Sequence, residues 1–514
     1  MFPGTHAATQ PDKPAIVHTT SGVVRTYADL ESRSVRLARY LREQGLGEGD
    51  DVAFLSGNLP EVFEVYWAGL RSGFVVTGVN HHLTAGEVAY ILGDCDARAL
   101  LVSRSCLELA GAALAELGDA IGIRVLLDPG EDGAPAGWTS YDEVQGTTSD
   151  APLADQPRGV DMLYSSGTTG RPKGVKAPLP GHGIDERLDL FTMVFAPAYG
   201  FDTDTVYYSA APTYHAAPLR FGGVVHATGG TVVMADRFDA EDALEVIQTH
   251  RVTHSQWVPT MFVRMLKLPE EVRASYDVSS LRVAVHAAAP CPVEVKQRMI
   301  DWWGPVLHEY YSSTEANGIT MVTPDEWLER PGTVGQAKLG VVRICGHDGA
   351  EVPTGDTGIV YFERDVRPFS YHKDDAKTAA ATHPDHPTWT TTGDIGHVDA
   401  DGYLYLTDRA AFTIISGGVN VYPQEIEDAL ALHPAILDVA VVGAADDDLG
   451  QVPVAVVQPA DGVEPSPALA EEILADLQGR IARFKVPREL HFVDALPRSA
   501  TGKLVKKDLA ARFA

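Results

Sequence analysis

The sequence predicts an α/β protein with a large N-terminal domain of doubly wound sheets, a β-rich subdomain, and a small α+β domain at the C-terminus. Short apolar strands alternate with amphipathic helical periods through the first half, as in residues 52–55 and 62–70. Such alternation is typical of parallel sheets that helices cover on both faces. The chain has 514 residues, which is too long for one hydrophobic core. We therefore expect two or three domains.

The expected elements of the first half follow in order along the chain. A helix begins after Thr26, because Thr26 and Asp29 have the spacing of a capping box and apolar residues recur on one face. Further strands are expected at residues 100–103, 125–128, 230–234 and 282–285, and a further helix at residues 240–250. Residues 130–157 are rich in Gly, Pro, Ser, Thr and Asp, which indicates a surface connection.

The pattern changes in the second half of the chain. Residues 340–406 combine short strands with many turn residues, which predicts a β-rich subdomain at the end of an N-terminal domain spanning residues 1–406. Helical periods return at residues 423–431 and 468–484. We place the domain boundary at residues 407–411 and the C-terminal domain at residues 412–514.

Composition limits the class of partner. The net charge of −29 argues against nucleic acid or an anionic membrane, which would need a broad basic face. An anionic ligand must then be held by locally placed cations, backbone amides or a metal ion. The four cysteines form no CxxC pair and no run approaches 18 apolar residues, so we expect a reduced, cytoplasmic protein without a membrane-spanning segment. The oligomeric state stays open, with a dimer as one option.

The strongest candidate for a binding site is the loop at residues 164–175, YSSGTTGRPKGV. It follows a short apolar run and offers glycine amides, hydroxyl groups, an arginine and a lysine, which suit a polyphosphate. The GxxxxGK[ST] spacing of the P-loop does not fit Gly167, Gly170 and Lys173. We interpret the loop as a nucleotide phosphate clamp; an ordinary Gly/Ser/Thr connection is the alternative.

Two further stretches suit a nucleoside. In residues 308–315, HEYYSSTE, Tyr311 has a ring that can stack on a purine and Glu315 has an oxygen ligand for a divalent cation, although a polar strand end would look similar. Thr392-Gly393-Asp394 precedes Arg409, and an aspartate after a strand can accept from both ribose hydroxyls. Turn aspartates are common, so this motif is weak alone.

Two stretches near the C-terminus complete the pattern. Gly417 and Gly418, in residues 416–420, allow a narrow ligand to approach the backbone, or form a plain tight turn. Lys503 lies in the glycine-containing run PRSATGK at residues 497–503, where a mobile lysine can enter a site or stay solvated.

In this order, the five stretches resemble the adenylate-forming superfamily, which includes acyl-CoA synthetases, luciferases and the adenylation domains of peptide synthetases. The resemblance runs from about Thr26 to Leu509. The acyl-CoA ligase branch is the most similar, because of ISGGVNVYPQEIE at residues 415–427 and the FKVPRELHFVDALPRSATGK run that ends at Lys503.

The resemblance implies that ATP activates a carboxylic acid as acyl-AMP, that the C-terminal domain then rotates, and that the acyl group passes to CoA. It implies Lys503, Thr314, Glu315 and His215 as catalytic residues, with Glu315 and Thr169 as contacts of Mg²⁺. The implied ATP- and AMP-binding residues are Ser165, Ser166, Gly167, Thr168, Thr169, Gly170, Lys173, Ala287, Ala288, Tyr311, Ser312, Asp394 and Arg409. Asp394 and Arg409 would hold the ribose, and Tyr311 would stack on the adenine.

The acid and the thiol are expected to use other residues. The predicted acyl pocket comprises His215, Phe221, Gly222, Trp257 and His286. Gly417 and Gly418 would line a CoA tunnel. A bulky apolar acid is expected, because Phe221 and Trp257 are flanked by small residues, although Trp257 is as readily explained as a core residue.

The sequence also departs from the family pattern. Relatives usually have glycine at positions 287, 288 and 312, where this chain has Ala287, Ala288 and Ser312, which predicts a tighter adenine pocket. At the hinge they usually have a lysine or aspartate where Ala411 stands, and an aspartate where Phe412 stands. Because polar contacts that favour one domain orientation are lost, a partner enzyme that accepts the acyl group is an alternative to CoA.

Overall fold

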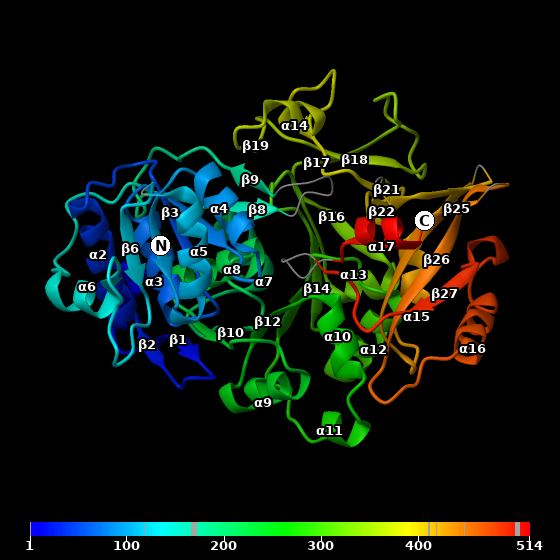
Figure 1. The fold of residues 1–514 in the computed structure, drawn as a ribbon, viewed down its shortest axis with the longest axis horizontal. Coiled ribbons are helices and arrows are strands. Elements are labelled where there is room, and N and C mark those ends of the chain that lie inside the picture. Colours follow the sequence, from blue (N-terminus) through cyan, green and yellow to red (C-terminus); the bar gives the residue numbers. More distant parts are fainter. Residues whose placement is uncertain are drawn as a thin grey trace. The chain divides into compact units, whose positions relative to one another are not determined.

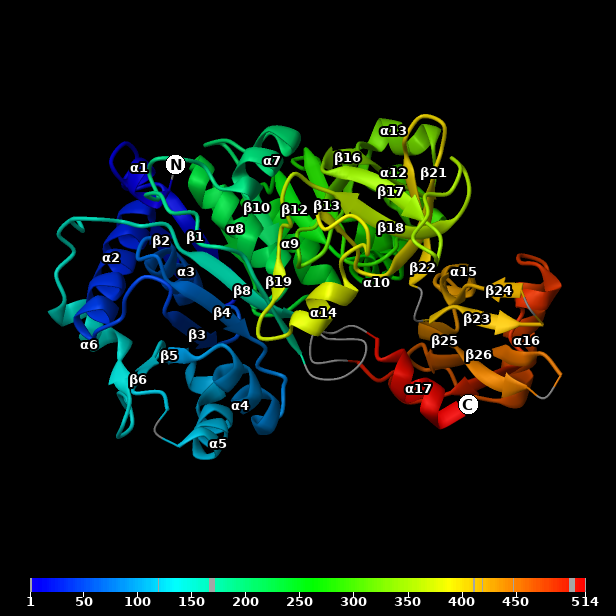
Figure 2. The same ribbon diagram turned by 90° about the horizontal axis from the view of Figure 1, so that it is seen from above.

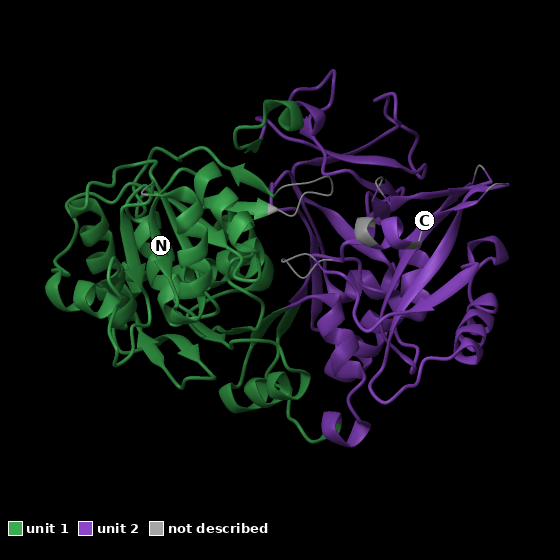
Figure 3. Cartoon of the chain, in the orientation of Figure 1, with its two compact units in different colours: residues 1–256, 274–284, 368–378 green, residues 257–273, 285–367, 379–514 purple. Residues whose placement is uncertain are grey.

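The computed structural model describes residues 2–118, 120–165, 172–409, 412–417, 419–446, 448–498 and 504–513. It has the α/β fold that the sequence predicts. The chain divides into two compact units, shown in Figure 3. Unit 1 comprises residues 1–256, 274–284 and 368–378, and unit 2 comprises residues 257–273, 285–367 and 379–514.

Unit 1 contains a mostly parallel sheet with the strand order β19-β9-β8-β4-β3-β5-β6-β7. Its strands are β3 (Asp51–Leu55), β4 (Val75–Val79), β5 (Ala97–Val102), β6 (Ile123–Leu126), β7 (Thr139–Ser140), β8 (Val160–Ser165), β9 (Lys173–Lys176) and β19 (Ser370–Tyr371). Helices α4 (Ala85–Asp94) and α5 (Leu107–Leu117) bury an apolar face against this sheet. Figures 1 and 2 show where these helices lie in unit 1. Strands β3, β4 and β5 are almost wholly buried, so they read as continuous apolar runs.

A second set of strands in unit 1 has the order β12-β10-β11-β1-β2. These strands are β1 (Pro14–His18), β2 (Val24–Thr26), β10 (Val206–Ser209), β11 (Thr231–Met234) and β12 (His254–Trp257). The other helices that begin in this unit are α1 (Pro3–Ala7), α2 (Tyr27–Glu43), α3 (Pro60–Leu70), α6 (Tyr141–Thr147), α7 (Leu190–Tyr199), α8 (Ala216–Thr228), α9 (Ala240–His250) and α14 (Asp375–Ala380). Strand β13 (Val283–His286) is divided between the two units, and so is β12, whose last residue, Trp257, belongs to unit 2.

Unit 2 contains antiparallel strands in the order β17-β18-β21-β22-β16-β15-β14, with β20 paired to β18. They are β14 (Leu307–Tyr311), β15 (Ile319–Val322), β16 (Thr333–Leu339), β17 (Val341–Cys345), β18 (Gly358–Glu363), β20 (Trp389–Thr390), β21 (Asp394–Val398) and β22 (Leu404–Arg409). Helices α10 (Pro259–Leu266), α11 (Glu270–Ala274), α12 (Val293–Trp303) and α13 (Pro324–Glu329) accompany them. The short strands that the sequence predicts from residue 340 onward are thus present.

The end of the chain forms a separate sheet within unit 2, visible in Figure 2. Its strands, β23 (Ile414–Ser416), β24 (Val419–Val421), β25 (Ile436–Asp446), β26 (Gly450–Pro459) and β27 (Glu489–Phe492), carry a core of their own with α15 (Pro423–Leu430) and α16 (Pro467–Gln478). Helix α17 (Lys506–Phe513) contributes Leu509 to a second apolar cluster. The placement of a domain boundary at residues 407–411 stays a prediction.

Local sequence signals succeeded where they were strong. Thr26 and Asp29 form the capping box of α2, with reciprocal side-chain and backbone hydrogen bonds. The structure differs from the expectations in several places. The strands expected at residues 100–103 and 125–128 are β5 and β6, which lie at residues 97–102 and 123–126. Residues 130–157 include β7 and α6, so they are more than a surface connection, and α16 ends at Gln478 rather than near residue 484. Among the described residues, no helix has the length and apolar character needed to span a bilayer.

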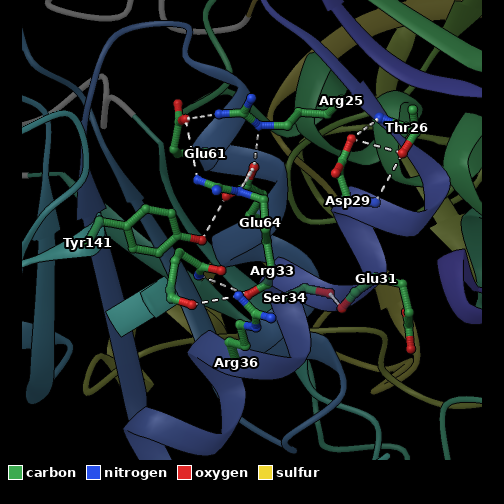
Figure 4. A network of polar contacts seen from close by, with 11 residues as sticks. Arg25, Thr26, Asp29, Glu31, Arg33, Ser34, Arg36, Glu61, Glu64 and Tyr141 are labelled. Carbon is green, nitrogen blue, oxygen red and sulfur yellow. Dashed lines mark hydrogen bonds and ion pairs between the residues drawn. The ribbon is translucent and has the colours of Figure 1, made fainter. Parts of the chain in front are cut away.

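A buried carboxylate connects the elements around α2, as Figure 4 shows. Glu64 of α3 is fully buried and accepts hydrogen bonds from Arg25 Nε at 3.1 Å, Arg33 Nε at 2.8 Å and the Tyr141 hydroxyl at 2.7 Å. Burial raises the pKa of Tyr141 well above its usual value, and the adjacent Glu64 adds to the effect. Because a buried charge is tolerated only when it is paired, this network fixes α2, α3 and α6 together.

We expect Glu64→Gln to lower the free energy of unfolding by about 3 kcal/mol, because it leaves two arginines beside a neutral amide. Tyr141→Phe, which removes a single hydrogen bond to a charged acceptor, should cost about 1.5 kcal/mol. Urea unfolding at pH 7, followed by circular dichroism, measures both. Equal stability of Glu64→Gln and the parent would show that the network contributes no net stability.

Candidate active site

A closed turn follows β14 in unit 2. Tyr311 ends the strand, and residues 312–318 lead to β15. The hydroxyl of Ser312 donates to the carbonyl of Gly318 over 2.8 Å. A Cβ atom on Gly318 would lie 1.9 Å from the ring of Phe362, so only glycine permits this approach. The hydroxyl that distinguishes this chain at position 312 therefore closes the turn; its effect on the adenine pocket stays a prediction.

The same turn contains the predicted phosphate and metal residues. Ser313 Oγ lies 2.9 Å from Asn317 Oδ1, and Ala316 has a left-handed φ of 50°. Glu315 is buried, and its carboxylate contributes to raising the pKa of Arg409. The turn thus holds Thr314 and Glu315 in a short segment with an unusual backbone.

The carboxylate of Asp394 is the centre of the candidate nucleotide site. Its Oδ2 accepts from the hydroxyl of Tyr311 at 2.7 Å and from Oγ1 of Thr392 at 2.8 Å. Its Oδ1 accepts from Nε of Arg409 at 3.0 Å. Asp394 and Arg409 are directly opposite each other in the antiparallel pair β21 and β22. The structure therefore brings together three residues that the sequence assigned to the base and the ribose.

The electrostatics of this group keep its donors protonated. Burial raises the pKa of Tyr311 well above its usual value, and Asp394 raises it further. Burial lowers the pKa of Arg409, but Asp394, Tyr311 and Glu315 together outweigh that effect, so the pKa lies above its usual value. Tyr311 therefore remains a neutral donor and Arg409 a cation over the physiological pH range.

The predicted opposite wall of the adenine pocket has a strained backbone. The amide of Ala287 donates to the carbonyl of Trp257 over 3.3 Å, which continues the pattern of β13. Ala288 then adopts a φ of 76°, a left-handed conformation that costs an alanine about 1–2 kcal/mol. Glycine adopts this conformation without that cost. Strain of this kind is typical of binding and catalytic segments.

Buried polar residues lie close in sequence to Ala287 and Tyr311. Glu309, two residues before Tyr311, accepts from Nζ of Lys296 at 2.6 Å. Its Oε2 is also 3.4 Å from Nε2 of His286, the residue before Ala287. Burial lowers the pKa of His286 well below its usual value, with a further contribution from Lys296, so His286 is neutral. One carboxylate thus connects the strands that carry Ala287 and Tyr311.

The candidate phosphate segment lies in unit 1. Strands β8 and β9 are antiparallel and pair Ser165 with Lys173 and Tyr164 with Gly174. Their connection includes Ser166, Gly167, Thr168, Thr169 and Gly170, which lie outside the described residues. The expected loop at residues 164–175 is therefore shorter than the sequence predicted, because its first two residues belong to β8 and residues 173–175 belong to β9. Lys173 is the first residue of β9.

His215 caps α8 in unit 1 with an extended backbone, and its ring lies 4.6 Å from that of Tyr214. Asn58, on the segment between β3 and α3, holds the preceding loop. Its Oδ1 accepts from the amide of Thr213 at 2.8 Å, and its Nδ2 donates to the carbonyls of Ala211 and Ala235. The loop that precedes His215 is thus held in place by the buried amide side chain of Asn58.

The C-terminal candidates are described only in part. Gly417 has a φ of 58°, which favours glycine, and its amide donates to the carbonyl of Leu449 over 2.8 Å. This conformation agrees with the tight-turn alternative, and a place in a CoA tunnel stays a prediction. Gly418, Ala411 and Lys503 lie outside the described residues.

The residues on either side of Lys503 are held firmly. Leu504 forms an antiparallel bridge with Arg498, and Arg498 forms an ion pair with Asp438. On the other side, Lys506 forms an ion pair with Glu427 of α15 at 2.7 Å. Arg498 and Lys506, which are both described, are therefore anchored to β25 and α15.

Comparison with known proteins identifies the family. The model of the AMP-binding enzyme family matches residues 4–365, and the model of its C-terminal domain matches residues 425–503. The chain belongs to the AMP-binding enzyme family. An indoleacetate–CoA ligase of Aromatoleum aromaticum is 33% identical over 98% of this chain and 96% of its own length, and a feruloyl-CoA synthase of an Amycolatopsis species is 33% identical over 100% and 98%. A solved anthranilate CoA ligase, AuaEII in complex with anthranoyl-AMP, aligns with a TM-score of 0.87 at 25% identity, over 99% of this chain and 96% of its own.

In this AMP-binding enzyme, the predicted acyl-pocket residues have packing roles. Phe221 is buried in unit 1, 4.7 Å from the ring of Phe195, and a Cβ on Gly222 would lie 2.3 Å from the ring of Phe63. Trp257 is buried in unit 2 beside Trp303, with ring centroids 5.4 Å apart. These contacts account for each residue without a ligand, so the acyl-pocket assignment stays a prediction.

The described residues contain no group of three or more His, Cys, Asp or Glu side chains arranged to hold a metal ion by themselves. Glu315 supplies a hard carboxylate oxygen, which fits Mg²⁺, because this ion is commonly held by one or two carboxylates together with substrate phosphates. The donor chemistry of the site thus suits a metal that arrives with a nucleotide.

The sequence did not predict the structural roles of three polar residues of this enzyme. Asn58 and Lys296 show no motif, and Glu309 was noted only as part of a polar run. Lys296 did leave a signal in the sequence, because this cation stands among the apolar positions Val295 and Met299 of a helix. The structure shows that Lys296 is fully buried. A charge among core positions indicates a buried partner, but only the fold shows that Glu309 is that partner.

We expect Lys296→Met to destabilise the protein in a pH-dependent way. Burial raises the pKa of Glu309 even beside Lys296, and removing the cation raises it further. When folding raises the pKa of a carboxyl group, the free energy of unfolding of the protein falls as the pH increases. The loss should therefore be small near pH 5 and reach about 3 kcal/mol at pH 8. Chemical denaturation at both pH values measures it.

The control for this prediction is the double variant Lys296→Met/Glu309→Leu, which removes both charges. It should recover most of the lost stability at pH 8, because no unpaired charge remains buried. A loss from Lys296→Met that is the same at pH 5 and pH 8 would contradict the proposed pairing.

Proposed function

We propose that this AMP-binding enzyme is an ATP-dependent acid–CoA ligase. It would convert a carboxylic acid and ATP to acyl-AMP and pyrophosphate, and then transfer the acyl group to the thiol of CoA. The hydrogen bonds of Asp394 to Tyr311 and Arg409 carry this proposal, because they place an aromatic ring, a carboxylate and a cation as a nucleoside requires. Relatives named as CoA ligases along nearly their whole length support it.

The first step joins two anions. An oxygen of the substrate carboxylate attacks the α-phosphorus, and the bond from that phosphorus to the pyrophosphate oxygen breaks. Neutralising charge and aligning the reactants should supply most of the catalysis. We assign Lys503 to the carboxylate and α-phosphate, and Ser165, Ser166, Thr168, Thr169 and Lys173 to the β- and γ-phosphates. Thr314 would contact phosphate, and Mg²⁺ bound at Glu315 would shield the pyrophosphate charge.

The second step breaks the acyl–phosphate bond. The sulfur of CoA attacks the carbonyl carbon, AMP leaves with its phosphate oxygen, and the thiol proton passes to solvent or base. We assign His215 to the junction of acid and thiol, and Gly417 with Gly418 to the CoA tunnel. The substrate proposed is a bulky apolar acid, aromatic or of medium to long chain. The names of the indoleacetate and feruloyl relatives favour an aromatic ring.

Ala411 and Phe412 favour a second candidate function. In place of the polar hinge residues of relatives, Phe412 here has its ring 5.4 Å from the ammonium of Lys506. If rotation of the C-terminal domain about that hinge is impaired, the enzyme would pass its acyl-AMP to another acceptor. We propose a cytoplasmic location for either activity, since the cysteines are free thiols.

One assay separates these functions. The protein is incubated with ATP, Mg²⁺, CoA and a panel of aromatic and fatty acids, and acyl-AMP and acyl-CoA are followed by mass spectrometry. Acyl-CoA from at least one acid supports the ligase. Acyl-AMP without acyl-CoA supports transfer to another acceptor, and neither product from a broad panel argues against both.

We expect Lys503→Ala to slow formation of acyl-AMP by about 100-fold or more, because a positioned cation is lost where negative charge develops. ATP binding should change little, since other residues hold the base, ribose and outer phosphates. Single-turnover adenylation and equilibrium dialysis with ATP measure the two quantities. Lys507→Ala provides a nearby lysine control that should retain parental activity. An unchanged adenylation rate in Lys503→Ala would refute the role of Lys503.

A further inference from the structure

Helix α8 begins at the residue that we assign to the junction of acid and thiol. His215 is its N-cap, and Phe221 and Gly222, which belong to the predicted acyl pocket, follow within its first two turns. An α-helix rises by about 1.5 Å per residue, so the steps from His215 to Phe221 cover about 9 Å. An acyl group that extends along α8 from this junction therefore reaches Phe221 at a depth that suits a short or compact acid.

The ring of Phe221 is enclosed by other aromatic rings. Phe221 is 1% exposed, and its ring centroid lies 4.7 Å from that of Phe195 on α7. Further rings surround it at centroid distances of 6.2, 6.1 and 6.3 Å, and they belong to Tyr199, Phe201 and Tyr207. All of these neighbours are buried, and we call them together with Phe221 the ring cluster. A closely packed interior admits few voids larger than a water molecule, so an acyl chain cannot pass through the ring cluster unless a ring is displaced.

Hydrogen bonds hold the ring cluster against β12. The hydroxyl of Tyr207 donates to Oε1 of Gln256 over 3.1 Å. At the end of α7, the carbonyl of Tyr199 accepts from Nε2 of His254 over 3.0 Å. Burial lowers the pKa of His254 to about 4, so this ring is neutral at pH 7. The ring cluster is therefore a fixed wall, unlike flexible methionine side chains that adapt to a ligand.

Helix α8 is itself fixed by the residues on either side of Phe221. Nη2 of Arg220 lies 2.7 Å from Oδ2 of Asp161 on β8, and both side chains are mostly buried. After Phe221, a Cβ atom on Gly222 would lie 2.3 Å from the ring of Phe63, so glycine allows α8 and α3 to approach closely. Phe221 therefore cannot move aside without disturbing the ion pair or the packing of the two helices.

We propose that the ring of Phe221 ends the acyl pocket, so that the enzyme accepts compact aromatic acids and excludes long straight-chain fatty acids. This proposal rests on the proposed function and narrows its substrate class. A compact acid fits the space between His215 and Phe221. The distal methylene groups of a long chain would have to displace a ring from a packed interior, and overpacking of this kind is unfavourable.

The test measures kcat/KM for formation of acyl-AMP without CoA, using phenyl- and naphthyl-substituted carboxylic acids and straight-chain acids from octanoic to hexadecanoic acid. The parent should use its best aromatic acid at least about tenfold better than dodecanoic acid. Phe221→Ala vacates the space of a ring, so it should raise kcat/KM for dodecanoic acid relative to that aromatic acid by about tenfold or more. Phe221→Leu vacates less space and should change this ratio in the same direction by about threefold.

Phe74→Leu is the matched control, because Phe74 is also fully buried in unit 1 but lies outside the ring cluster. It should leave the ratio of the two acids as in the parent. The ratio compares two substrates of one protein, so a smaller fraction of folded enzyme does not alter it. If Phe221→Ala fails to fold, Phe221→Leu decides the test.

A parent that uses dodecanoic acid as well as its best aromatic acid would overturn the inference and leave the proposed function standing. A parental ratio in the folded Phe221 variants, or an equal change in Phe74→Leu, would also overturn the inference alone. A parent that forms acyl-AMP from no acid of either set would overturn the proposed function together with this inference.

Discussion

The carboxylate of Asp394 is the interaction on which the candidate nucleotide site depends. It accepts from Tyr311, Thr392 and Arg409, and so combines a ring, a hydroxyl and a cation from β14, the start of β21 and the end of β22. Three donors on one carboxylate hold it in a single orientation and leave little freedom to its partners. A nucleoside would meet groups that are already positioned, which lowers the entropic cost of binding.

Buried ion pairs also connect separate helices and strands of this protein. The chain carries a net charge of −29, yet its described interior contains paired cations such as Lys296 with Glu309 and Arg33 with Glu64. Each pair connects separate elements: α12 with β14, and α2 with α3. Such pairs add little net stability compared with apolar residues, but breaking one is costly. They therefore specify which elements lie together.

In the hairpin of β8 and β9, Lys173 is the first residue of β9, and its ammonium lies 4.9 Å from the centroid of the Tyr371 ring. Glu315 is a buried carboxylate, and its role in holding a cation stays a prediction. The expectation from composition that anions are bound by local groups also stays a prediction.

The sequence was most informative where a signal is local or where several motifs follow in order. The capping box of Thr26 is a spacing rule, and the sequence predicted it correctly. The motifs around Tyr311, Asp394 and Arg409 identified residues that hydrogen bonds then join. Tertiary partners could not be predicted in this way. Asn58 holds a loop more than 150 residues away, and Tyr371 meets Lys173 through a strand pairing that no periodicity encodes.

The account is tested most directly by acid-dependent exchange of labelled pyrophosphate into ATP, measured without CoA in the parent and in Asp394→Ala. This reaction reports reversible formation of acyl-AMP and nothing later. The account predicts exchange that requires a carboxylic acid and falls by at least about tenfold in Asp394→Ala, since one charge-assisted hydrogen-bond centre is lost. Exchange that is unchanged in Asp394→Ala, or conversion of ATP to ADP by the parent, would contradict it.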